Sequence, residues 1–433
     1  MHRRGDRPGR PRPAPVTAAQ ASWQPTPREQ EALARQSHVQ ALGRVDQVWP
    51  WLAAQHGEVM AVDAPHAAHP ERFNYQQLAE RIERAAAAFQ QLGLRVGDVV
   101  GLFAENSPRW LVADQGLMRA GVVDAVRGAA APVEELRYIL EDSKAVALVV
   151  QTGDLLERLQ LSADLQAQLR FVLVLEGEAP PGALDFDTFL SRADGHQPPD
   201  PMANREQASA VHTIATILYT SGTTGRPKGV PLTHANLLHQ MRSLATVTRP
   251  DAGAPVLSVL PIWHSYERSA EYYFFSCGCS QSYTTIKQLK RDLPRVKPVI
   301  MATVPRLWEA VQAGFEDVVK TLPPARQRLL RSALANSKAY RLARRRSLDL
   351  LIEPLRKRDR LRALAEATRR WPAHALASQL IWPKLRQQLS GGALLYPING
   401  GGAIAPHVDA FFEAVGIELL VCLLYTSDAA DEE

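Results

Sequence analysis

Cysteine and long hydrophobic runs are both scarce in this chain, and each scarcity excludes a class of protein. Three cysteines, Cys277, Cys279 and Cys422, are spaced neither as a disulfide framework nor as a zinc site. No apolar run approaches the roughly eighteen residues that a membrane-spanning helix needs. We therefore expect a protein of the reducing cytoplasm, either free or peripheral on the inner face of the membrane, whose cysteines are structural.

Length and apolar patterning indicate an α/β protein with more than one subdomain. The 433 residues exceed what one hydrophobic core normally supports, and 46% of them are hydrophobic. Apolar residues recur at helical spacing over 75–92 and stop at Gly93, whereas 99–103 and 145–150 are typical of buried strands. Strands that alternate with helices predict an α/β sheet architecture.

The first 24 residues differ from the rest in charge and composition. They are rich in proline and arginine, lack apolar periodicity, and set five arginines against the single acid Asp6. The arginines are Arg3, Arg4, Arg7, Arg10 and Arg12. This composition predicts a disordered basic tail, and a miscalled start codon would explain it equally well.

The most informative stretch is 219–229, which reads Tyr-Thr-Ser-Gly-Thr-Thr-Gly-Arg-Pro-Lys-Gly between two apolar segments. Glycines let backbone N–H groups approach an anion, hydroxyl groups add hydrogen-bond donors, and a lysine adds positive charge. We therefore predict a phosphate-binding loop. The candidate ligands are Thr220, Ser221, Gly222, Thr223, Thr224, Gly225 and Lys228.

This loop has two other interpretations. A Walker-type loop needs Ser or Thr after its lysine and then a helix, but Lys228 is followed by Gly229 and by the apolar strand pattern of 230–232. The helix is expected only afterwards, over 234–241 with Thr233 as N-cap, so the order is strand, loop, strand, helix. An ordinary surface hairpin remains the second alternative.

The block 218–236 resembles the phosphate-loop signature of the adenylate-forming (AMP-binding) superfamily, which includes acyl-CoA synthetases, nonribosomal-peptide adenylation domains and luciferases. The resemblance implies that the loop holds the β and γ phosphates of ATP while a carboxylate attacks the α phosphorus. Acyl-adenylate and pyrophosphate form, and a thiol then displaces AMP. It also implies the large N-terminal domain of these enzymes, two mixed sheets flanked by helices, over 25–421.

Further blocks narrow the resemblance to enzymes that activate long-chain fatty acids. Residues 260–268 resemble the LPxWHxxER segment of long-chain acyl-CoA synthetases, and 283–289 and 304–309 are similar to downstream motifs of that family. Residues 127–136 look like the acyl-acyl-carrier-protein synthetase branch. Together they imply a long-chain fatty acid, ATP and Mg²⁺, with CoA or acyl carrier protein as thiol acceptor.

Within 260–268 we expect Trp263 and His264 near the substrate carboxylate and the acyl entrance. His264 is the catalytic candidate, because it should end an apolar strand, where ligands gather in α/β sheets. Trp263 and Trp308 are alternatively core aromatics. Glu267 and Arg268 are as consistent with a functional role as with structural pairing to other charges.

A glycine run at 400–402 is the third candidate site. Gly400, Gly401 and Gly402 permit close approach of the backbone to a flat ring, and the resemblance implies an adenine-binding turn there. A helix is expected to follow over 408–415 and to close at Gly416.

Residues 320–386 are strongly basic, with eighteen lysines and arginines against four acids. We expect a helical insertion that docks either on an anionic membrane surface or on an acidic carrier protein, or that has no partner at all. A nucleic-acid partner is not expected, because no recognition motif accompanies the charge.

The chain departs from the family after Val421. The resemblance predicts a Tyr-Gly-x-Thr-Glu turn, whose Glu holds magnesium, but 422–433 contain no equivalent, so no metal ligand is assigned. We expect 422–433 to be non-native, the small C-terminal lid domain to be missing, and this chain to be a poor catalyst. An aryl or amino-acid ligase and a non-catalytic acyl or nucleotide binder remain alternatives.

Overall fold

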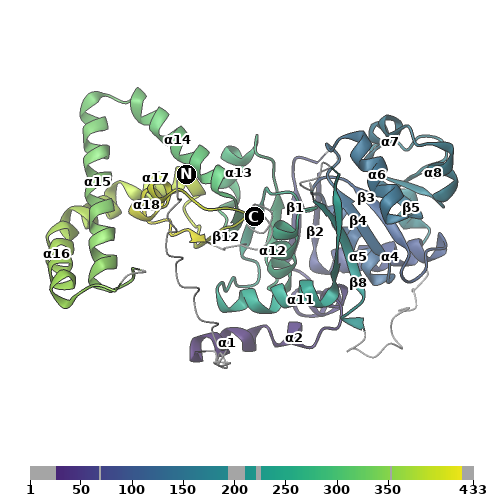
Figure 1. Ribbon diagram of the computed structural model, residues 1–433, viewed down its shortest axis with the longest axis horizontal. Coiled ribbons are helices and arrows are strands. Elements are labelled where there is room, and N and C mark those ends of the chain that lie inside the picture. The colour runs from purple at the N-terminus through teal and green to yellow at the C-terminus, as the bar shows by residue number, and fades with distance from the viewer. Residues whose placement is uncertain (1–25, 68–69, 194–209, 221–225, 352–353, 422–433) are drawn as a thin grey trace, which may run out of the picture.

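The computed structural model describes residues 26–67, 70–193, 210–220, 226–351 and 354–421 (Figure 1). It contains two seven-stranded sheets, and in each sheet every strand is parallel except one antiparallel strand at an edge. The expected two mixed sheets flanked by helices are confirmed. Within the described residues, no helix combines the length and apolar content needed to cross a bilayer.

One sheet is built from residues 99–233 in the order β7-β6-β5-β3-β4-β8-β9. Its strands are β3 (Val99–Phe103), β4 (Val123–Arg127), β5 (Ala147–Thr152), β6 (Val172–Glu176), β7 (Leu184–Asp185), β8 (Ile214–Thr220) and β9 (Lys228–Thr233). The last strand carries Pro231, which a sheet tolerates at an edge because its missing N–H leaves no internal ladder bond unmade.

The second sheet has the order β14-β13-β12-β10-β11-β1-β2 and joins both halves of the chain. Its strands are β1 (Met60–Ala64), β2 (Glu71–Asn74), β10 (Pro255–Ser258), β11 (Ser280–Tyr283), β12 (Ile300–Thr303), β13 (Tyr396–Asn399) and β14 (Leu420–Val421). Strand β1 pairs in parallel with β11, where Val62 lies opposite Gln281.

Helices occupy most of the connections between these strands (Figure 1). In the first half they are α1 (Pro27–Arg35), α2 (Ser37–Gln40), α3 (Val48–His56), α4 (Tyr75–Gln91), α5 (Pro108–Arg119), α6 (Val133–Ser143), α7 (Gly153–Leu159), α8 (Ala163–Gln168) and α9 (Phe186–Ser191). In the second half they are α11 (His234–Ser243), α12 (Ser265–Ser276), α13 (Leu289–Val296), α14 (Pro305–Thr321), α15 (Pro324–Ser347), α16 (Lys357–Leu380), α17 (Trp382–Ser390) and α18 (Pro406–Val415). Two 3₁₀ helices, Val45–Gln47 and Leu244–Thr246, complete the set for the described ranges.

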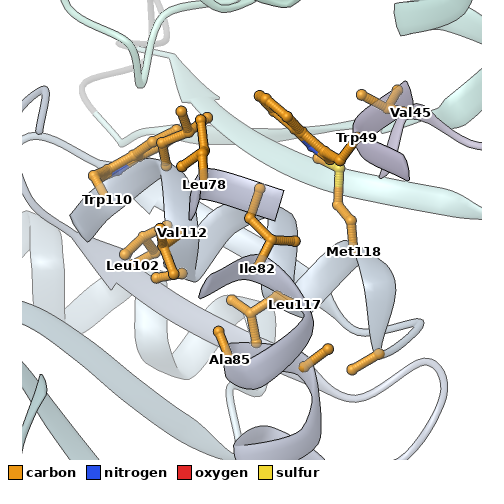
Figure 2. Packing of buried hydrophobic residues seen from close by; sticks show 14 of the residues in the cluster. Val45, Trp49, Leu78, Ile82, Ala85, Leu102, Trp110, Val112, Leu117 and Met118 are labelled. Carbon is orange, nitrogen blue, oxygen red and sulfur yellow. The ribbon is translucent and has the colours of Figure 1, made fainter. Parts of the chain in front are cut away.

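The largest core cluster lies between the sheets and is centred on α4 and α5 (Figure 2). It includes Val62 of one sheet and Leu102 of the other, so both sheets share it. Helices α4 and α5 pack closely because Gly116 faces Ala85; a Cβ on Gly116 would stand 2.7 Å from the Ala85 Cβ. The two sheets are therefore joined by one continuous apolar core.

The local expectations are largely confirmed. Helix α4 spans Tyr75–Gln91, β3 spans Val99–Phe103, and α18 ends at Gly416, whose φ of 86° is the left-handed conformation that glycine adopts readily. The strand expected at 145–150 is shifted to Ala147–Thr152.

The described part of residues 320–386 is largely helical, as expected, and lies in the long connection between the neighbouring strands β12 and β13. Helices α15 and α16 make a hairpin that projects at the left of Figure 1, away from the sheets. Ion pairs from Arg345 to Glu413 and from Arg341 to Glu418 connect α15 to α18 and to the residues that follow it.

Candidate active site

The phosphate-loop candidates lie at a β-hairpin. Strands β8 and β9 are antiparallel, with Thr220 opposite Lys228, and both side chains are exposed at the loop end. Helix α11 follows β9 directly: Thr233 caps it, and its side chain forms a reciprocal capping box with Asn236. The predicted order of strand, loop, strand and helix is confirmed. Ser221, Gly222, Thr223, Thr224 and Gly225 lie outside the described residues.

Contacts from the described part of this hairpin run to α6. The Tyr219 hydroxyl donates to Asp142 at 2.7 Å, and the Arg226 guanidinium lies 5.9 Å from the centroid of the Tyr138 ring. Gly229 is tightly packed, because a Cβ there would stand 3.0 Å from the Tyr219 ring and one of the two would have to shift. These contacts fix the base of the hairpin that presents Lys228.

A second group of predicted residues lies where the two sheets meet. The connection from β10 to α12, residues 259–264, is held by Asn106, which follows β3 in the other sheet. The Asn106 amide donates to the Leu260 carbonyl at 2.7 Å and accepts from the Ile262 N–H at 2.8 Å. Asn106 was not predicted from the sequence, because a single Asn in a connection carries no signal of a partner 156 residues away.

Trp263 bridges the same junction. Its indole N–H donates to Glu105 at 3.2 Å, and the Arg127 guanidinium lies 4.7 Å from its ring centroid. Gly128 follows Arg127 in the chain, and a Cβ there would clash with the indole nitrogen of Trp263. Trp263 is half-buried, whereas Trp308 is buried in the core with its N–H donated to Thr303 at 2.8 Å.

His264 does not end a strand, so that expectation is wrong. Strand β10 ends at Ser258, and His264 is instead the N-cap of α12, exposed, with its Nδ1 accepting from the Tyr266 N–H at 3.4 Å. The apolar pattern of 259–264 suggested a longer strand. In the structure the Asn106 side chain, rather than a neighbouring strand, hydrogen-bonds the carbonyl of Leu260 and the N–H of Ile262.

The glycine turn follows β13 and packs against the start of α12. The Tyr266 hydroxyl donates to the Ile398 carbonyl at 3.0 Å, and a Cβ on Gly400 would stand 2.7 Å from the Tyr266 ring. Gly401 has a φ of 73°, and Gly401 and Gly402 are exposed. The structure thus brings the glycine turn together with the segment of His264, and leaves the backbone of Gly401 and Gly402 accessible.

Asn399, immediately before this turn, is a further candidate. Its side chain is fully buried, and neither amide atom has a hydrogen-bond partner among the described residues. A buried amide without partners is costly, so such a group at the carboxyl edge of a sheet suits a ligand with both donor and acceptor atoms. An Asn directly before a glycine run was the available sequence signal.

Glu267 and Arg268 are both buried on α12 but do not pair with each other. Arg268 pairs with Asp114 of α5 and, at 2.7 Å, with Asp124 of β4. The Arg268 guanidinium also donates to Thr216 at 2.7 Å and to Tyr272 at 2.8 Å. The structural alternative is therefore confirmed for Arg268, which ties α12 to the other sheet.

Glu267 lies on the same helix, and the pKa of its buried carboxyl group is raised. Burial raises its pKa from 4.5 to about 8, against a hydrogen bond of 2.6 Å from the Ser258 hydroxyl that lowers it. One turn further, burial raises the pKa of Glu271 well above its usual range. The Glu267 carboxyl group is therefore largely protonated at neutral pH, and a protonated carboxyl group is unsuited to binding a cation.

A magnesium site does not emerge from the described residues, in which no cluster of three His, Cys, Asp or Glu side chains is arranged to hold a metal ion. The described residues are better suited to a nucleotide than to a metal ion. The exposed backbone of Gly401 and Gly402 offers an open surface, and the exposed Lys228 offers a positive charge.

Comparison with known proteins identifies the family. The AMP-binding enzyme profile matches residues 49–425. The chain is 36% identical over 396 residues to the chloroplastic long-chain-fatty-acid–[acyl-carrier-protein] ligase AEE15 of Arabidopsis thaliana, covering 87% of this chain and 54% of that protein. It is 28% identical to the long-chain-fatty-acid–CoA ligase FadD15 of Mycobacterium tuberculosis, covering 86% of this chain and 60% of that protein.

A solved structure supports the fold. The N-terminal domain of FACL13 from Mycobacterium tuberculosis superposes with a TM-score of 0.60 at 16% identity, covering 89% of this chain and 76% of that one. The present chain spans little more than half the length of the curated relatives it matches. With its two mixed sheets, its hairpin at Lys228 and its glycine turn after β13, the chain belongs to the AMP-binding enzyme family.

Proposed function

We propose that this chain carries the nucleotide- and acyl-binding part of a ligase that activates a long-chain fatty acid with ATP. The observation that carries the proposal is the 36% identity, over most of this chain, to a long-chain-fatty-acid–[acyl-carrier-protein] ligase. In the reaction a fatty carboxylate oxygen bonds to the α phosphorus of ATP and pyrophosphate leaves. A thiol of CoA or of acyl carrier protein then attacks the acyl carbon and releases AMP.

The proposed roles follow the three sequence blocks. Thr220, Lys228 and the intervening residues 221–225 bind the phosphates, and the lysine offsets charge on the leaving pyrophosphate. Gly400, Gly401 and Gly402 hold the adenine, with Gly400 also making room for Tyr266. Asn399 is assigned to the adenine edge, because its amide offers one donor group and one acceptor.

His264 and Trp263 are assigned to the fatty acid. The exposed imidazole of His264 at the N-terminus of α12 suits an anionic carboxylate, because a helix N-terminus carries partial positive charge. Trp263 lines the acyl entrance. The segment 320–386 would dock either the acidic carrier protein or an anionic membrane surface. Magnesium is proposed as the nucleotide's counter-ion, without a protein ligand assigned here.

Binding of a fluorescent ATP analogue to the 433-residue chain tests the nucleotide assignment. Lys228→Ala should weaken nucleotide binding about tenfold or more while leaving the affinity for a long-chain fatty acid within about twofold. Lys290→Ala, an exposed lysine on α13, is the matched control. Equal affinities of the Lys228 and Lys290 variants for the nucleotide would remove Lys228 from the site.

Substrate class requires a separate measurement. Binding competition among fatty, aryl and amino acids on the same chain separates the three ligase types. Tight binding of a long-chain fatty acid with weak binding of the other two supports the proposal. A preference for benzoate-like or amino acids would favour the alternative ligases instead.

A further inference from the structure

We propose that the α15–α16 hairpin is a docking surface for an anionic lipid bilayer, on which arginines bind lipid phosphates and leucines and a tryptophan enter the acyl region. Of the two partners considered above for 320–386, the proposal therefore selects the membrane surface over the acidic carrier protein. The reason for a membrane rests partly on the proposed function, since a long-chain fatty acid dissolves in bilayers.

Large apolar side chains are exposed on this hairpin to an unusual degree. Nine of the seventeen exposed large hydrophobic residues of the described chain lie within 324–380. They are Leu329, Leu342, Leu348, Leu350, Leu361, Leu364, Trp371, Leu376 and Leu380. Scattered exposed leucines need no explanation, but nine such residues on one projecting hairpin, seven on α15 and α16 and two in the connection between them, indicate an interaction surface (Figure 1).

Three sides of helix α16 differ in their side chains, although the exposed Leu376 follows Arg369 by seven residues and therefore lies on the basic side. Ala363, Ala367, His374 and Ala377 form the buried stripe. Leu361, Leu364 and Trp371, spaced by three and seven, follow a second side and are 67%, 52% and 57% exposed. Arg358, Arg362 and Arg369, spaced by four and seven, follow a third side, also exposed. Apolar and basic stripes on one solvent-facing surface are typical of helices that lie in a bilayer interface.

The positive charge on this surface is mostly not neutralised within the molecule. Ten exposed basic residues of 320–386 have no ion pair with any residue in the described ranges. They are Arg326, Arg328, Arg331, Arg344, Arg346, Arg356, Lys357, Arg358 and Arg369 of the hairpin, and Lys384 of α17. Such a charge excess attracts a surface of anionic headgroups over about a Debye length.

The apolar stripe distinguishes a bilayer from an acidic protein. A carrier protein docked through charge alone would leave Leu361, Leu364 and Trp371 in water, whereas a bilayer covers leucine and accommodates the amphipathic indole at its interface. The guanidinium groups then lie at the level of the phosphates, where bidentate hydrogen bonds are available.

Vesicle co-sedimentation of the 433-residue chain, without ATP, tests the proposal. We expect binding to phosphatidylcholine vesicles that contain phosphatidylglycerol, and binding weaker by about tenfold or more to pure phosphatidylcholine. Leu364→Ser with Trp371→Ser should weaken binding about tenfold at any salt concentration. Arg358→Gln, Arg362→Gln and Arg369→Gln together should weaken it most at low salt. Val247→Ser, an exposed apolar residue away from the hairpin, is the control and should leave binding unchanged.

Three results would overturn the proposal: no binding of the original chain to anionic vesicles, an equal loss in the Val247 variant, or binding of a purified acidic carrier protein through the three arginines without vesicle binding. The substituted side chains are exposed, so the variants should fold like the original chain. Thermal unfolding of each variant checks this. A chain that binds vesicles but no fatty acid or nucleotide would support this surface and contradict the proposed function separately.

Discussion

At the scale of single residues, Glu267 gives the clearest pH dependence. Burial raises its pKa from 4.5 to about 8, so the folded state binds a proton that the unfolded state has released over that range. Its contribution to stability is therefore fully present below about pH 4.5 and is lost as pH rises through 8. Glu267→Gln should gain stability relative to the original chain, by roughly 3–5 kcal/mol, between those limits.

Urea unfolding at about pH 5 and about pH 8.5 measures this difference. Glu141→Gln on α6 is the matched control, since its side chain is exposed. A Glu267 variant whose stability tracks that of the original chain at both pH values would show that the carboxyl group is ionised in the folded protein.

Gly400 provides a second residue-scale prediction. A methyl group there would meet the Tyr266 ring at 2.7 Å, so Gly400→Ala should destabilise the protein by about 1–3 kcal/mol. Gly402→Ala is the control, because the nearest heavy atom, on Pro305, is 3.6 Å from the added Cβ. In a double-mutant cycle with Tyr266→Ala, the cost of Gly400→Ala should fall by about 1 kcal/mol or more. An unchanged cost would place the strain elsewhere in the turn.

The sequence predicted residue types at the site better than their contacts. The glycines were expected because few other residues allow a close approach of the backbone, and Gly400 does make such an approach, to Tyr266 rather than to an observed ligand. The partners of Arg268 could not be predicted, since Asp114 and Asp124 are more than 140 residues away and no local pattern links them.

At the scale of elements, Arg268 makes α12 the tie between the sheets. Removing it leaves the buried carboxyl groups of Asp114 and Asp124 without their shared cation. Burial already raises the pKa of Asp124 to about 8 and Arg268 opposes that rise, so Arg268→Met should cost about 3–5 kcal/mol. Adding Asp114→Asn and Asp124→Asn should recover part of that loss, because no uncompensated charge then remains buried. Chemical denaturation of the three chains provides the measurement. If Arg268→Met alone lowered the free energy of unfolding by less than about 1 kcal/mol, Arg268 would not be what connects α12 to the other sheet.

Helices and strands with strong periodicity, such as α4 and β3, were predicted almost to the residue because local pattern and tertiary burial agree there. The end of β10 was not, because residues 259–264 are apolar enough to continue a strand. What stops the strand is the amide of Asn106 from the other sheet, a long-range contact that periodicity does not encode.

At the scale of the whole molecule, the α15–α16 hairpin and the shared core differ in how they are held. Helix α5 is buried over most of its length, whereas α16 buries only Ala363, Ala367, His374 and Ala377. Local opening of α16 should therefore cost less free energy than opening of α5. We expect amides in the middle of α16 to exchange with deuterium at least about tenfold faster than those of α5.

Hydrogen–deuterium exchange read by mass spectrometry checks this expectation, with α4 as a second internal reference. Equal protection of α16 and α5 would mean that the hairpin unfolds only with the whole protein. Anionic vesicles should slow exchange in α16 selectively if the hairpin is the lipid-docking surface.

The order of strands has a consequence for synthesis on the ribosome. The sheet built from 99–233 has all its strands once Thr233 has emerged, but β1 must wait for β11, since Val62 pairs with Gln281. At about 5–20 residues per second, the intervening chain takes roughly 10–40 s to appear. For that interval β1, with the side chains of Ala61 and Val62 that end fully buried, has only β2 as a neighbour. The nascent chain thus offers an unpaired apolar strand edge to chaperones, or to other nascent chains, well before the second sheet is complete.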